Sequence, residues 1–168
     1  MHSFSLALRL IALCALFWLA VVDVRERRLP TRIVLAIGGL FLIDAAVDRM
    51  PGASLLAHAA LACCVFAVCA LLFAARMLGG GDAKLAAVIF LWTGPALSLP
   101  TLALISVIGT LVSCVSLATR RLNDQQPSAP RRALAMFSSQ RGVPYGVALA
   151  LGGGTTIVLP AVLPFLTR

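Results

Sequence analysis

Long apolar runs separated by short polar segments constrain this chain more than any other feature of its sequence. A helix needs roughly 20 apolar residues to cross the ~30 Å hydrocarbon core of a bilayer, and each run approaches or reaches that length. The runs are Leu6–Val22, Ile33–Val47, Ala53–Ala75, Leu85–Leu99, Thr101–Ala118 and Val143–Leu166. The pattern predicts an all-α, polytopic membrane bundle of about six transmembrane helices, with residues 1–168 forming a single domain.

The composition excludes most other classes of protein. Hydrophobic residues make up 61% of the chain and charged residues 12%, with a mean hydropathy of +1.01. A soluble domain is about 45–50% apolar and about 25% charged, so a soluble enzyme, a disordered regulator and a fibrous repeat are excluded. The net charge of +8 is explained by basic residues in the short gaps between apolar runs. We therefore expect a lipid bilayer as partner and no nucleic acid.

One helix boundary has to be inferred from turn residues. Residues 85–118 carry no charge and are too long for one crossing, so a turn is expected near Thr93-Gly94-Pro95 or near Ser98-Leu99-Pro100. The only long polar connection is Thr119–Gly142, which we expect to be a surface loop, with a short interfacial helix around Arg131–Phe137.

Basic residues predict the orientation of the bundle. Alternate connections, at residues 23–32, 76–84 and 119–142, hold eleven of the 14 Lys and Arg residues. Cytoplasmic loops retain Lys and Arg, so both termini are expected to face away from the cytoplasm.

Two aspartates fall at the same predicted depth. Asp23 ends the first helix and Asp82 begins the fourth, both at the cytoplasmic boundary. The bundle can bring these two helix ends together. Two carboxylates at the same depth in a low-dielectric setting tend to share one proton, which is the arrangement of an aspartic protease. Each also has a plainer interpretation: Asp82 could be a helix N-cap, and Asp23 an anion balanced by nearby arginines.

Glycines surround the second aspartate. Gly79, Gly80 and Gly81 precede Asp82, and their missing side chains would let a substrate backbone approach or permit non-helical backbone at membrane depth. We therefore count them as candidate site-shaping residues.

Several further residues are expected to be structural. Asp44 should reach the far interface with Asp48 and Arg49, and His58 should form a hydrogen bond within the bundle rather than bind metal. Gly38-Gly39 and Gly152-Gly153-Gly154 should mark close helix contacts.

The cysteines do not suggest a binding site. They lie within apolar runs, form no CxxC pair, and are expected to be small buried hydrophobes without a disulfide, zinc site or other cofactor. They are Cys14, Cys63, Cys64, Cys69 and Cys114.

Three motifs together resemble the type IV prepilin peptidases, membrane aspartic proteases with a GxGD signature. The segment DVRERRLP at Asp23–Pro30 looks like the family's first aspartate segment, GGGDAK at Gly79–Lys84 matches its GxGDxK, and VPYG at Val143–Gly146 resembles its Pro-Tyr-Gly stretch. The motifs occur in the family's order and extend over nearly the whole chain. Position 31 departs from the pattern, because it is Thr where the family commonly has Asn.

The resemblance implies a function. Asp23 and Asp82 would be the catalytic pair of an endopeptidase that cuts the short basic leader from prepilins at the cytoplasmic face of the bacterial inner membrane, with the pilus assembly machinery as a further candidate partner. Lys84, Pro30, Pro144, Tyr145 and Gly146 would shape the site or hold substrate. The chain is similar to short, peptidase-only members that serve Flp or Tad-type pili, so we expect no methyltransferase or zinc-binding extension.

Two alternatives remain open from the residues. A related GxGD protease could act on another membrane protein, or a noncatalytic membrane subunit or small transporter could use the aspartates to bind a proton or cation.

Overall fold

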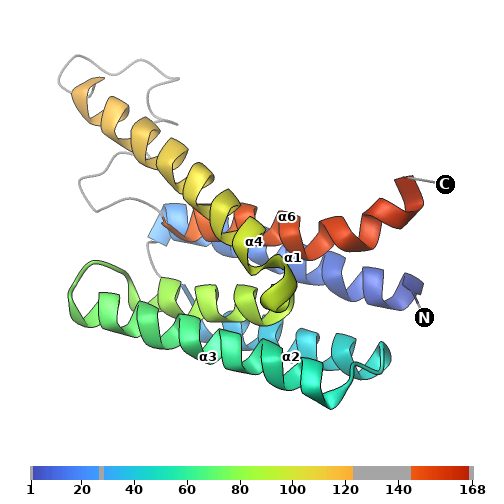
Figure 1. Ribbon diagram of the computed structural model, residues 1–168. Helices are drawn as coiled ribbons and strands as arrows, with labels where there is room; N and C mark the ends of the chain where they lie inside the picture. The colour runs from blue at the N-terminus through green and yellow to red at the C-terminus, as the bar shows by residue number, and fades with distance from the viewer. Residues whose placement is uncertain (1, 27–28, 123–144, 167–168) are drawn as a thin grey trace.

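A computed structural model describes residues 2–26, 29–122 and 145–166 of the chain. Within these residues the chain forms five helices and no strand, so the all-α prediction is confirmed. The helices are α1 (His2–Glu26), α2 (Thr31–Val47), α3 (Gly52–Ala74), α4 (Gly80–Leu122) and α6 (Tyr145–Leu166). Both chain termini lie at one end of the bundle, on the right of Figure 1.

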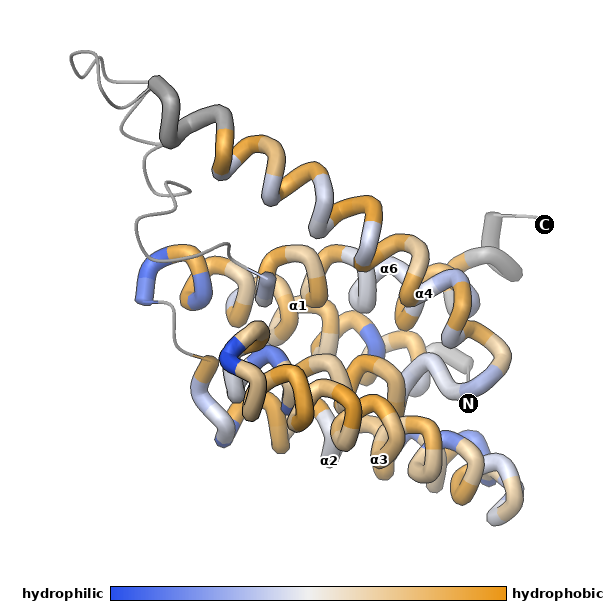
Figure 2. Tube along the Cα trace, turned by 60° about the vertical axis from the view of Figure 1, so that its left-hand side comes forward, coloured by the Kyte–Doolittle hydropathy of each residue, from blue (hydrophilic) through white to orange (hydrophobic). Residues whose placement is uncertain are grey.

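The helices have the length and hydropathy of membrane spans. Three of those described, α1, α3 and α4, are long and apolar enough to cross a bilayer, and Tyr145–Pro160 is a shorter apolar helix. Figure 2 shows hydrophobic residues along most of each helix, with hydrophilic ones mainly near helix ends. The protein is therefore a membrane protein, but the predicted count of six spans is not confirmed.

The cysteines are mostly exposed, so the expectation that they are buried is wrong. Cys14, Cys63, Cys64 and Cys114 are exposed, and only Cys69 is partly covered. Large apolar side chains are exposed as well, including Leu99 at 76%. In a membrane protein the outer surface is as apolar as the core, so an apolar run does not tell which residues point inward.

Helix α4 is divided by a break at Gly94. This residue has φ 62° and ψ −177°, a backbone conformation that favours glycine. We call residues 80–93 the first arm of α4 and residues 95–122 the second arm. Figure 1 shows the chain turning sharply between the arms, and both views show the second arm leaving the bundle. The turn expected at Thr93-Gly94-Pro95 is thus confirmed, whereas Pro100 lies within the second arm.

A histidine satisfies the backbone at this break. Pro95 has no N–H, so the carbonyl of Leu91, four residues earlier, cannot receive its helical hydrogen bond. The ring Nδ1 of His58, on α3, donates to that carbonyl oxygen over 2.8 Å. The ring also stacks on Phe41 of α2, and a Cβ at position 94 would overlap it. The expected hydrogen bond of His58 within the bundle is confirmed.

The core lies between α1, α2, α6 and the first arm of α4. Its largest fully buried apolar side chains are Leu16, Leu19, Val34, Ile37, Phe41, Leu85 and Ile89. Helix α3, described over its whole length, contains no buried residue and packs outside this core against α4.

Glycines bring α6 into contact with three segments. A Cβ on Gly152 would lie 2.8 Å from Ile105 Cγ1, one on Gly153 2.5 Å from Ile89 Cγ2, and one on Gly154 2.7 Å from Leu13 Cδ1. The close contacts predicted for these glycines are confirmed.

The corresponding prediction for Gly38-Gly39 is wrong. A Cβ on Gly38 would make only an ordinary contact, and one on Gly39 would meet nothing within 4 Å.

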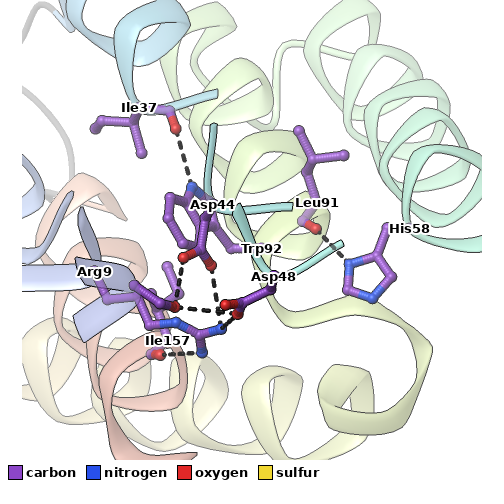
Figure 3. Close-up of polar contacts among 9 residues, drawn as sticks. Arg9, Ile37, Asp44, Asp48, His58, Leu91, Trp92 and Ile157 are labelled. Carbon is purple, nitrogen blue, oxygen red and sulfur yellow. Dashed lines mark hydrogen bonds and ion pairs between the residues drawn. The ribbon is translucent and has the colours of Figure 1, made fainter. Parts of the chain in front are cut away.

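An ion-pair cluster ties three helices near the terminal end of the bundle (Figure 3). Asp44 of α2 is buried, and its Oδ2 lies 3.1 Å from Nη2 of Arg9 on α1. Ser5 Oγ donates to Asp44 Oδ1 over 2.6 Å, and Arg9 Nη1 donates to the Ile157 carbonyl of α6 over 3.4 Å. Asp44 is therefore structural, as predicted, and its ion-pair partner is Arg9.

We predict that Arg9→Met destabilises the fold by ~3 kcal/mol, because it leaves the buried Asp44 carboxylate without its cation. Thermal unfolding in detergent should show a clear loss. Adding Asp44→Asn to Arg9→Met should restore part of the stability, since the uncompensated charge is then removed. An unchanged melting temperature for the single variant would contradict the assignment.

We also predict that His58→Ala lowers stability by about 1–3 kcal/mol, because the Leu91 carbonyl then loses its donor. His58→Gln retains an N–H donor and should recover part of that loss. Detergent melting curves of the three proteins test this, and equal losses for Ala and Gln would argue against the hydrogen bond.

Candidate active site

Three helix ends meet at the end of the bundle opposite the chain termini. They are the last turn of α1 and the first turns of α4 and α6, at the left of Figure 1. These turns carry Asp23, Asp82 and Gly146 respectively. Segments far apart in sequence are thus brought together here.

Asp23 is held by the start of α6. Its side chain is buried, and its Oδ2 accepts a hydrogen bond from the backbone N–H of Gly146 over 3.0 Å. A Cβ on Gly146 would lie 2.7 Å from the same oxygen, so only glycine allows this approach. The free N–H groups and dipole of a helix N-terminus favour an anion, which explains how a carboxylate can be accommodated at this depth.

Asp82 lies in the first turn of α4 and reaches back along the chain. Its carboxylate accepts a hydrogen bond from the backbone N–H of Gly79, the residue directly before the helix. Asp82 is the third residue of the helix, so it is not the N-cap itself but the acidic partner typical of a capping box.

The second oxygen of Asp82 is different. Oδ1 is buried and has no hydrogen-bond partner among the described residues. The negative charge of Asp23 also acts on the Asp82 carboxyl group. The two aspartates are therefore electrostatically coupled at one end of the bundle, as the sequence led us to expect.

The three glycines before Asp82 are packed against the protein's own chain. A Cβ on Gly79 would lie 2.7 Å from Asp82 Oδ2, one on Gly80 3.3 Å from the Phe73 ring, and one on Gly81 2.8 Å from Leu29 Cβ. Gly80 and Gly81 are also helical, at the start of α4. The glycines therefore permit close packing around the first turn of α4. The space beside them is filled by the protein's own residues and does not leave room for a substrate backbone.

Lys84 joins the starts of two helices. Its Nζ donates to Thr31 Oγ1 over 3.1 Å, and its side chain is exposed. Thr31 begins α2, directly after Pro30, whose carbonyl accepts from the N–H of Ile33 over 3.1 Å. Thr31, at the position that departs from the resembled family, thus makes a contact of its own.

The remaining sequence-predicted residues are only partly described. Tyr145 begins α6, and together with Asp82 it lines an apolar cavity that is described below. Pro144 lies outside the described residues, as does the expected interfacial helix at 131–137. Of the 119–142 connection, residues 119–122 continue α4.

Sequence reasoning missed the partners of two buried aspartates, Asp23 and Asp44. The backbone of Gly146 was not expected to bind Asp23, although a glycine at the start of an apolar helix was visible. At the opposite end of the bundle, the ion pair of Arg9 with the buried Asp44 was not predicted either. Within residues 2–26, 29–122 and 145–166, no three His, Cys, Asp or Glu side chains are grouped as metal ligands.

The fold and these contacts define a membrane-embedded helical bundle with a coupled carboxylate pair at one end. The model of the type IV leader peptidase family matches residues 10–114, which include both aspartates and more than half of the chain. The protein belongs to this family and is accordingly a membrane protease. No curated protein and no solved structure matches the chain.

We predict that Gly146→Ala reduces cleavage of a type IV prepilin by about 100-fold, because the new methyl group displaces the Asp23 carboxylate. Gly39→Ala is the matched control, since nothing lies within 4 Å of its Cβ position. Initial rates in detergent or liposomes measure both. Full activity of Gly146→Ala would show that the contact with Asp23 is dispensable.

Proposed function

We propose that this protein is an aspartic endopeptidase that removes the short basic leader from type IV prepilins of the Flp-like kind, for pilus biogenesis or secretion. Asp23 and Asp82 are its catalytic residues, and residues 1–168 act as one peptidase domain. The observation that carries the proposal is the coupled pair itself: Asp23 is bound by the α6 N-terminus, and Asp82 has a buried, unpartnered oxygen.

The proposed chemistry follows from two carboxyl groups that share one proton. The ionised carboxylate takes a proton from water as the water oxygen attacks the carbonyl carbon of the scissile peptide bond. The protonated partner donates a hydrogen bond to the carbonyl oxygen. The C–N bond then breaks, and the leaving nitrogen receives a proton from the pair.

The proposed location is the cytoplasmic face of the bacterial inner membrane. The ends of α1 and α3 and the start of α6 lie at the end with the aspartates, and the sequence segments that follow α1, follow α3 and precede α6 hold most of the Lys and Arg residues. The positive-inside rule then places this end in the cytoplasm and both termini on the opposite side. A prepilin whose apolar helix lies in the bilayer would present the junction of leader and helix at this depth.

We predict that Asp23→Asn and Asp82→Asn each reduce cleavage at least ~1,000-fold, because neither amide can exchange the required proton. The test is co-expression with a Flp-type prepilin from the same genome, with the precursor and product followed by gel and intact mass. Asp48→Asn is the matched control, since Asp48 directly follows α2, which ends on the side of the bundle that holds the chain termini.

The outcomes separate the alternatives. Cleavage that requires both aspartates supports the proposal. Cleavage of another membrane precursor but not the prepilin would assign a different substrate to the same pair. Absence of cleavage by well-folded wild-type protein, together with proton or cation movement in liposomes, would favour the transporter.

A further inference from the structure

A large apolar cavity opens beside Asp82. It has a volume of about 940 Å³ and is bounded by α3, both arms of α4 and the start of α6. That volume corresponds to roughly two turns of a helix about 10 Å across. The second arm leaves the bundle at the Gly94 break, and this divergence separates its inner face from α3 (Figures 1 and 2).

Its two long walls are faces of helices. On α3, the lining residues Leu61, Val65, Val68 and Leu72 recur every three or four positions. On the second arm, Ser106, Thr110 and Ser113 recur in the same way, and Gly109 lies beside Thr110 on the same wall. Small and hydroxyl-bearing residues on one face are typical of surfaces where transmembrane helices pack together. Ala86 and Phe90, on the first arm, also line the cavity.

The cavity reaches the candidate catalytic group. Asp82 is one of its lining residues, and the Oδ1 of Asp82 is buried without a hydrogen-bond partner among the residues described. A ligand held in the cavity would therefore lie beside Asp82 at one end and along apolar helix faces for the rest of its length.

We propose that this cavity binds the apolar helix of the pilin precursor, the segment that directly follows the scissile bond. The inference rests on the proposed function and specifies how that site receives its substrate. With the scissile bond at Asp82, the substrate helix begins at the cytoplasmic end and runs antiparallel to both α3 and the second arm. The gap between the two walls faces lipid, so the helix can move in sideways from the bilayer.

Native cysteines provide a direct test. Cys69 and Cys114 line opposite walls of the cavity, whereas Cys63 is exposed on α3 but does not line it. Enzymes that retain one of these cysteines, with Asp82→Asn to prevent turnover, are oxidised with a Flp-type prepilin that carries single cysteines along its apolar helix. We expect disulfides from Cys69 and Cys114 at substrate positions spaced by three or four residues, and none from Cys63.

Filling the cavity gives an independent test. Ser106→Trp should reduce kcat/KM for the prepilin at least ~10-fold, because the indole would occupy space that the substrate helix needs. Ala103→Trp places the same side chain elsewhere on the exposed second arm, outside the cavity lining, and should leave kcat/KM within about twofold.

The results distinguish this inference from the proposed function. If wild-type protein cleaves the prepilin but Cys63 crosslinks as well as Cys69 and Cys114, or if Ser106→Trp matches Ala103→Trp, the cavity assignment is wrong and the peptidase assignment stands. Crosslinks that join two copies of the enzyme through Cys69 or Cys114, with no prepilin in the product, would assign the cavity to a second copy. Absence of both cleavage and crosslinks would overturn both.

Discussion

A carboxylate placed at membrane depth needs hydrogen-bond donors, and the rest of this structure depends on how that need is met. Lipid supplies no donors, so the donors have to come from the protein. The backbone N–H groups at the start of a helix have no partners within their own helix, and they are available for an anion. Asp23 uses the start of α6, and Asp82 uses the residue before α4. The meeting of three helix ends is therefore what makes a carboxylate pair tolerable in this bundle.

The same shortage of donors governs the break in α4. Pro95 leaves the Leu91 carbonyl without its helical partner, and His58 of α3 supplies the missing N–H. Gly94 adopts the conformation that turns the chain and leaves room for the imidazole. This contact fixes α3 against the bend although α3 contributes no buried residue to the core. Helix α3 thus packs mainly against α4, and its His58 stabilises the bend that sets the direction of the second arm of α4.

Much of this architecture could be predicted from the sequence, because it follows from helix length and helix breaking. The apolar runs predicted an all-α membrane bundle, and Gly94-Pro95 marked the break in α4. Alternating basic connections placed Asp23 and Asp82 at one end, and the structure brings them together there. Side-chain direction could not be predicted in the same way. Lipid-facing and core-facing positions are equally apolar, so the exposure of Cys14 and the open surroundings of Gly39 were missed.

The two arms of α4 have separate tasks on either side of one glycine. The first arm carries Asp82, packs into the core and lines part of the cavity, while the second arm forms one wall of the cavity and exposes apolar side chains such as Leu104 and Leu111 outside the cavity lining. Substitutions along the cavity wall of the second arm change the shape of the cavity without replacing either aspartate or Gly146, which binds Asp23. Homologues could therefore differ in which transmembrane segments the cavity accepts through substitutions on this arm alone. The bend at Gly94 thus allows the two arms of α4 to vary separately in evolution, although the chain folds around a single core.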